Sequence, residues 1–177
     1  RRQNEMSLDA YDAVTGDKRA TLYTERHEKY ITSYTSVAFL PWDADKFILQ
    51  SQKDGYNHLY LFNTKGEMLR QLTSGNFVVY DLLGFDKARK RAIILSAESS
   101  PIQSNLYAVD IATGKRTLLD NGRGVHANII SPSGFHDRAL SPDGGWIIDN
   151  YAEPTVPRNI DFINLKTDKG TLYFTAD

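Results

Sequence analysis

An internal repeat of 46 to 48 residues is the feature that most constrains how this chain can fold. Residues 47–66 align with residues 93–114, so that Leu59-Tyr60 falls on Leu106-Tyr107. Residues 8–16 form a partial third copy, in which Asp12 and Gly16 both lie 98 residues before Asp110 and Gly114. A period in the high forties is typical of β-propellers, in which each repeat supplies one four-stranded blade.

Short apolar runs separated by turn-forming residues fill each repeat. Phe47-Ile48-Leu49 and residues 58–62 are rich in aromatic and branched side chains, and Asp54-Gly55 lies between them. Such runs, bounded by glycine and aspartate, indicate strands joined by tight turns. We find no stretch of helical apolar spacing long enough to predict a long helix.

We therefore predict an all-β fold, namely a β-propeller fragment of about three and a half four-stranded antiparallel blades. The strands are expected near residues 6–13, 18–24, 35–40, 46–52, 57–63, 68–73, 77–85, 91–97, 104–110, 115–120, 136–140, 146–151, 158–165 and 171–176. The whole chain, residues 1–177, is expected to be part of a single propeller domain. Its blade pieces are expected at about 1–26, 27–75, 76–122 and 123–177.

The blade count carries a physical consequence. A propeller closes into a ring of typically about 4 to 8 blades, so that every blade packs between two neighbours. Three and a half blades would leave an apolar face uncovered at each end. We therefore expect the chain, which starts with Arg1 inside a blade, to be a piece of a longer protein or to form a homo-oligomer through its open blade faces.

Composition narrows the classes of partner. The chain has 21 Lys and Arg against 22 Asp and Glu, which disfavours a dedicated nucleic-acid binder or a polybasic membrane module. It has no Cys, so no disulfide or thiolate metal site is expected. No apolar run is long enough to predict a membrane span. We expect no nucleic-acid partner and no cofactor.

Three segments resemble the propeller domain of dipeptidyl peptidase IV and its bacterial relatives, in the prolyl oligopeptidase family of serine peptidases. They are residues 50–62 followed by 70–75, residues 96–101 leading to Leu106-Tyr107, and residues 136–151 with Pro157. The resemblance runs from about Gln3 to Asp177, and residues 125–134 depart from it as an insertion.

The resemblance implies a parent hydrolase that is a periplasmic or secreted serine-type aminopeptidase. Such an enzyme removes N-terminal X-Pro or X-Ala dipeptides, and its nucleophile lies in an α/β-hydrolase domain of the same chain. The present sequence has no Gly-x-Ser-x-Gly elbow and no adjacent Glu-Glu pair. We therefore assign no catalytic residue here. The resemblance implies that this part walls and gates the cavity for peptide substrates and is itself inactive.

Tyr30 and Tyr34 are the candidate substrate-binding residues. They lie in residues 30–36, between the first two blade pieces. The matching connection in the family leans toward the active-site cavity, which implies that an aromatic face and a hydroxyl contact substrate there. The competing interpretation is that the two tyrosines belong to the core or line the channel.

The four histidines do not predict a metal site. None of His27, His58, His126 and His136 is paired with another at the spacing of metal ligands. His58 precedes Leu59-Tyr60 on an expected strand, where a structural hydrogen bond is the expected role.

A basic cluster lies at the turn between two expected strands. It consists of Lys87, Arg89, Lys90 and Arg91, and it indicates either a patch for an anionic partner or a solvated turn that discourages edge pairing. The alternative function for the whole chain is a non-catalytic propeller for protein binding or assembly in the periplasm.

Overall fold

The computed structural model describes residues 3–31, 37–126 and 139–176. These residues form strands and turns, with no helix among them, and therefore no helix that could cross a bilayer. The strands are β1 (Glu5–Tyr11), β2 (Lys18–Arg26), β3 (Ala38–Leu40), β4 (Asp43–Ser51), β5 (His58–Asn63), β6 (Met68–Gln71), β7 (Val79–Asp86), β8 (Arg91–Ser96), β9 (Asn105–Asp110), β10 (Arg116–Leu118), β11 (Trp146–Glu153), β12 (Val156–Asn164) and β13 (Lys169–Thr175).

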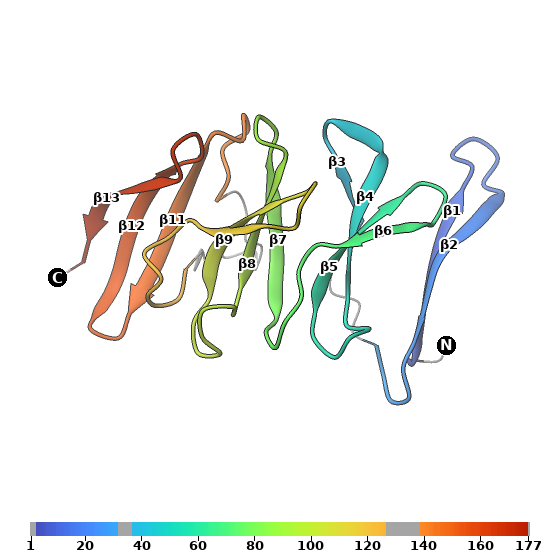
Figure 1. Ribbon diagram of the computed structural model, residues 1–177, viewed down its shortest axis with the longest axis horizontal. Helices are drawn as coiled ribbons and strands as arrows, with labels where there is room; N and C mark the ends of the chain where they lie inside the picture. The colour runs from blue at the N-terminus through green and yellow to red at the C-terminus, as the bar shows by residue number, and fades with distance from the viewer. Residues whose placement is uncertain (1–2, 32–36, 127–138, 177) are drawn as a thin grey trace. The chain divides into compact units, whose positions relative to one another are not determined.

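The strands form four antiparallel sheets in which consecutive strands pair (Figure 1). The sheets contain β1-β2, β3-β4-β5-β6, β7-β8-β9-β10 and β11-β12-β13. The all-β propeller prediction is confirmed, with strand boundaries close to those expected. The strand expected near 136–140 falls largely outside the described residues, although Leu140 forms an antiparallel bridge with Ile147.

The chain divides into two compact units, residues 1–73 and residues 74–177. In the first unit, aromatic side chains of β4 and β5 pack against β1-β2. Phe47 and Phe62 stack with ring centroids 5.7 Å apart, and Tyr23 meets Phe62 edge-on at 5.2 Å. Leu8 and Leu22 pack on the same cluster. These contacts bury one face of the β3-β4-β5-β6 sheet.

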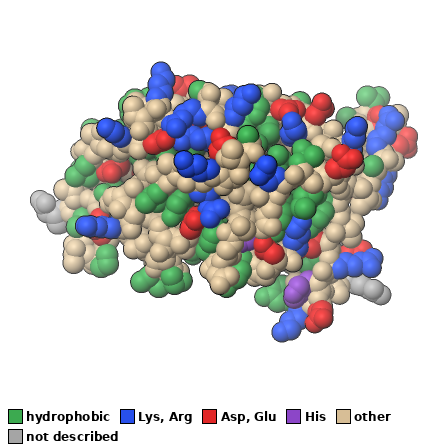
Figure 2. All heavy atoms as spheres, in the orientation of Figure 1, with side chains coloured by type: hydrophobic (Ala, Val, Ile, Leu, Met, Phe, Trp, Pro, Cys, Tyr) green, Lys and Arg blue, Asp and Glu red, His purple; other side chains and the backbone are tan. Residues whose placement is uncertain are grey.

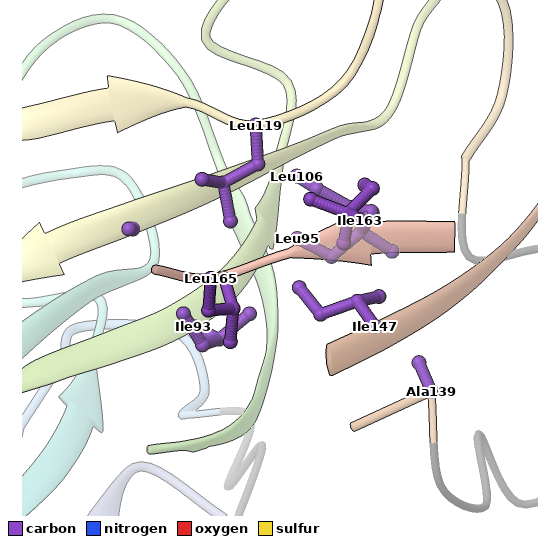
Figure 3. Packing of buried hydrophobic residues seen from close by; sticks show 9 residues of the cluster. Ile93, Leu95, Leu106, Leu119, Ala139, Ile147, Ile163 and Leu165 are labelled. Carbon is purple, nitrogen blue, oxygen red and sulfur yellow. The ribbon is translucent and has the colours of Figure 1, made fainter. Parts of the chain in front are cut away.

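The second unit has an aliphatic core between its two sheets. All six residues of β8 are buried, and Ile93 and Leu95 point toward Ile147 of β11 and Ile163 of β12 (Figure 3). Removing one such Ile or Leu side chain typically costs about 2–5 kcal/mol. The rest of this cluster comprises Leu106, Ala108, Leu119, Ala139 and Leu165.

The sequence repeat corresponds to one recurring turn. In each sheet an Asp or Asn opens the last hairpin, and its Oδ1 accepts a hydrogen bond from a backbone N–H two or three residues later, at 2.7–3.0 Å. These residues are Asp12, Asn63, Asp110 and Asn164. A residue with positive φ follows each of them: Gly16, Gly66, Gly114 and Asp168. The repeat thus encodes hairpin geometry as well as apolar faces.

Two of these glycines give a matched test of the turn. A Cβ on Gly66 would lie 2.6 Å from the backbone oxygen of Leu22, whereas a Cβ on Gly16 would meet nothing within 4 Å. Both residues have positive φ. We expect Gly16→Ala to lower the free energy of unfolding by about 1 kcal/mol through backbone strain alone. Gly66→Ala should cost at least about 2 kcal/mol. Urea unfolding of both variants measures this, and equal losses would contradict the close approach of Gly66 to Leu22.

Candidate functional site

Tyr30 lies at a small cavity in the first unit. Its side chain is 61% exposed and follows the end of β2. The cavity has a volume of about 230 Å³. It is lined by Glu25, His27, Lys29, Tyr30, Ile31, Gln52 and Gly55. Tyr34, the other predicted substrate residue, lies outside the described residues.

Backbone hydrogen bonds hold this segment beside the start of the chain. The N–H of His27 donates to the carbonyl oxygen of Asn4 at 3.0 Å, and that of Ile31 donates to Gln3 at 2.9 Å. The pairing of β1 with β2 therefore continues beyond Arg26, the last residue of β2. This fixes the position of the backbone at Tyr30. Gln52 and Gly55, in the turn between β4 and β5, also line the cavity.

A buried carboxylate lines the same cavity. Glu25 is 7% exposed, and its Oε2 accepts hydrogen bonds from Ser51 Oγ at 2.6 Å and from Tyr23 OH at 3.0 Å. Burial raises the pKa of Tyr23 to about 12, so the phenol keeps its proton and can donate it. Sequence reasoning missed Glu25. Its position two residues after Tyr23, on the inward side of β2, was the available signal.

His58 has the structural role that the sequence predicts. It is fully buried, and its Nδ1 lies 3.1 Å from Thr73 Oγ1. The same hydroxyl oxygen accepts the backbone N–H of Leu59 at 3.0 Å. The interaction secures the segment after β6 against β5. Within the part of the chain that the structure describes, no group of His, Asp and Glu has the arrangement of a metal site.

His126 forms a buried charge cluster in the second unit. Its ring is 1% exposed, its Nδ1 lies 2.6 Å from Asp149 Oδ2, and its Nε2 lies 2.6 Å from the carbonyl oxygen of Arg123. Both ring nitrogens face acceptors, an arrangement that favours the doubly protonated imidazolium. Asp120 lies 3.6 Å from Nδ1, and Tyr151 stacks on the ring at 4.5 Å.

The carboxylates decide the charge of His126. Burial alone would lower the pKa of His126, but the hydrogen bond and charge of Asp149 and the charge of Asp120 outweigh burial and raise it. Burial raises the pKa of Asp120 and of the neighbouring Asp161. The cluster ties the segment that follows β10 to strand β11.

The basic cluster is largely committed to internal ion pairs. Arg91 is 4% exposed, which corrects both sequence interpretations of this residue, a patch and a solvated turn. Its guanidinium donates to Asp86 Oδ2 at 2.9 Å and to Asp168 Oδ1 at 2.7 Å. Arg89 donates to Asp168 Oδ2 at 2.7 Å. Ion pairs with two carboxylates thus offset the desolvation cost of burying the Arg91 guanidinium.

The exposed charges on one face of the molecule do not share one sign. Lys87 and Lys90 remain exposed at the turn. On the face shown in Figure 2, basic and acidic side chains are interspersed. This arrangement agrees with the balanced composition and gives no support to an extended anion-binding patch.

Replacing His126 tests the charged cluster. We expect His126→Gln to lower the free energy of unfolding by about 3 kcal/mol near pH 6, because it leaves the buried Asp149 and Asp120 without their cation. His27→Gln, at an exposed position, should change it by less than about 0.5 kcal/mol. Denaturant unfolding of both variants measures the difference.

The same cluster predicts a direction for the pH dependence. The pKa of His126 is raised above 6.5, so its stabilisation is complete below pH 6.5 and is lost as the pH rises through the raised pKa. The raised pKa values of Asp120 and Asp161 act in the same direction at lower pH. Above pH 6.5, His126→Gln should therefore show a flatter stability profile than the unmodified chain. Parallel profiles would contradict an imidazolium at this site.

Known proteins resemble this chain over most of its length. The family model of the dipeptidyl peptidase IV (DPP IV) N-terminal region matches residues 1–158. A protein of Aspergillus flavus assigned as dipeptidyl peptidase 4 is 26% identical over 163 residues, covering 88% of this chain and 20% of that relative.

Two solved structures superpose on the chain with TM-scores of 0.79. One is a protein of Bacteroides ovatus assigned as a dipeptidyl aminopeptidase IV, 31% identical, of which the match covers 26%. The other is Porphyromonas gingivalis dipeptidyl peptidase 4, 26% identical, of which it covers 23%. Both superpositions cover 99% of this chain. The chain spans only about a fifth to a quarter of the length of these relatives. Because the family model matches residues 1–158, the chain belongs to the family of the dipeptidyl peptidase IV N-terminal region.

Proposed function

We propose that this chain is the propeller part of a dipeptidyl-peptidase-IV-like serine exopeptidase that removes N-terminal X-Pro or X-Ala dipeptides. The match of the family model to residues 1–158 carries the proposal, and the two structural superpositions support it. Residues 1–177 would form part of a single propeller domain, in blade pieces of about 1–26, 27–75, 76–122 and 123–177.

The residues present indicate which catalytic groups must lie outside this chain. An exopeptidase of this kind needs a nucleophile, its base and a group that holds the substrate's N-terminus at a fixed distance from the scissile bond. This sequence has neither a Gly-x-Ser-x-Gly elbow nor an adjacent Glu-Glu pair. We therefore place the catalytic Ser, Asp and His in an α/β-hydrolase domain of the same polypeptide. A periplasmic or secreted location is part of the same proposal.

Assaying the isolated chain tests directly whether the catalytic groups lie outside it. The purified 177-residue polypeptide should not hydrolyse a Gly-Pro chromogenic substrate, because it lacks a nucleophile elbow. The full-length polypeptide should hydrolyse it. Absorbance of the released chromophore measures both. Activity in the isolated chain, or a full-length protein that lacks both activity and a Gly-x-Ser-x-Gly elbow, would favour instead a non-catalytic propeller for binding or assembly.

We also propose that Tyr30 and Tyr34 form part of the substrate wall. The position of Tyr30 supports this role, because Tyr30 is exposed and lines the same cavity as Glu25. A tyrosine in such a place offers an apolar face and a hydroxyl to a peptide.

Substitution of Tyr30 in the full-length protein tests that role. We expect Tyr30→Ala to raise KM for a Gly-Pro substrate about three- to tenfold with little change in kcat, because it removes binding contact and no reacting group. Tyr11→Ala is the matched control, since Tyr11 is 60% exposed on β1 and does not line the cavity. Steady-state kinetics distinguish the two variants. An unchanged KM for Tyr30→Ala would contradict contact with substrate.

An apolar face on the last sheet supports the proposed homo-oligomer. A groove of about 710 Å³ opens on β11-β12-β13, lined mainly by large apolar side chains. They include Trp146, Ile148, Phe162, Leu172 and Tyr173. The opposite face of the same sheet is covered by the aliphatic core. In a chain of these 177 residues alone, we propose that a second copy covers the groove.

Light scattering measures this association. The 177-residue chain should be a dimer at tens of micromolar protein, roughly the range of a modest apolar interface. Ile148→Lys should shift it to monomer, because a charge would be buried in the interface. Val14→Lys is the control, since Val14 is 95% exposed in the turn between β1 and β2. A monomeric unmodified chain at that concentration would refute the dimer.

A further inference from the structure

The cavity beside Tyr30 contains a carboxylate, that of Glu25, which forms no ion pair within 4.0 Å among the described residues. Glu25 is 7% exposed, and no Lys, Arg or His nitrogen in the described ranges lies within 4.0 Å of its carboxylate. Taking a carboxylate out of water without a partner is costly. The structure accommodates it at the wall of a cavity of about 230 Å³.

The two oxygens of Glu25 differ in their surroundings. Oε2 accepts hydrogen bonds from Ser51 and Tyr23. Within the part of the chain described, Oε1 accepts none, yet it is not among the fully enclosed unsatisfied atoms. Oε1 is therefore the oxygen that remains open to a ligand. A carboxylate oxygen accepts strongly from a charged donor.

The basic residues nearest along the chain form no ion pair with Glu25. Arg26 pairs with Glu5 at 3.1 Å. Lys53 places its Nζ over the ring of Tyr60, 4.0 Å from the ring centroid. Burial lowers the pKa of Lys53, and the charge of Glu25 opposes that shift, so Lys53 is a nearby cation that is not in contact with Glu25. His27 Nδ1 accepts the backbone N–H of Lys29 at 3.2 Å. Lys29 itself is exposed. Glu25 is the one acidic side chain that lines this cavity.

We propose that the cavity binds a primary alkylammonium group, such as the side chain of a lysine in a peptide, through Glu25 Oε1. The ring of Tyr30 at the cavity would cover the alkyl stem and face the cation. A guanidinium fits less well, because bidentate pairing needs both carboxylate oxygens and Oε2 is already occupied. The test of this site does not depend on peptidase activity, because it measures binding alone.

The probe is n-butylammonium, titrated into the 177-residue chain while the carbon-13 signal of the Glu25 carboxylate is followed by NMR. We expect saturable binding with a dissociation constant of roughly millimolar magnitude, as suits so small a ligand. n-Butylguanidinium should bind several-fold more weakly, and n-butanol should not bind measurably. Equal binding of n-butanol would overturn the proposal, because the site would then recognise only the alkyl group.

Three variants separate the roles of the residues. Glu25→Gln keeps an acceptor for Ser51 and Tyr23 but removes the charge, and it should weaken binding at least about tenfold. Glu28→Gln removes an equal charge from an exposed position that does not line the cavity, and it should change binding less than about twofold. Tyr30→Ala should weaken binding about two- to fivefold.

Unchanged affinity in Glu25→Gln would overturn the proposal. Circular dichroism shows whether Glu25→Gln folds. If it does not fold, the deciding measurement is the affinity for n-butylammonium relative to n-butanol, in the unmodified chain and in Tyr30→Ala. Tyr30 is 61% exposed, so its replacement leaves the fold intact. Loss of peptidase activity in a full-length protein with intact n-butylammonium binding would refute the proposed function and leave this site standing.

Discussion

Packing of one apolar sheet face against the next is the interaction on which the rest of this structure depends. In the first unit the contact is aromatic, with Phe47 and Phe62 against Leu8 and Leu22. In the second it is aliphatic, with Ile93 and Leu95 against Ile147 and Ile163. Each sheet is a simple meander whose own hydrogen bonds could not hold it, because isolated small sheets are marginal in water. Burial between sheets supplies the missing free energy.

The polar sites are built where two sheets approach each other. Glu25 of β2 reaches Ser51 at the end of β4, and Arg91 of β8 reaches Asp168 in the turn before β13. His126, from the segment after β10, reaches Asp149 of β11. In each case a charged group is buried beside the apolar contact and tied to the neighbouring sheet. These bonds fix how one sheet is positioned against the next within each unit.

The sequence was sufficient to predict the sheets, because alternation and the Asp-to-Gly turns are local signals. The repeat correctly placed β5 and β9 in equivalent positions, and it indicated the hairpins at Asn63 and Asp110. The fourth hairpin was expected between the strands near 158–165 and 171–176, but the repeat did not show that Asp168 takes the positive φ that glycine takes elsewhere.

The buried charges could not be predicted in this way, because their partners are distant in the sequence. Arg91 and Asp168 are 77 residues apart, and Glu25 and Ser51 are 26 apart. A local pattern of basic residues therefore indicated a surface cluster where the fold has buried one arginine. The same limit applies to Tyr30, whose exposure on the cavity depends on backbone bonds to Gln3 and Asn4.

We propose that this chain is part of the propeller of an enzyme whose nucleophile lies outside these 177 residues. Treatment of the full-length polypeptide with a fluorophosphonate, followed by mass spectrometry of its peptides, tests it most directly. The account predicts a single labelled serine, located outside residues 1–177 within a Gly-x-Ser-x-Gly sequence. A labelled serine within residues 1–177, or no labelled serine in a polypeptide that releases dipeptides, would contradict it.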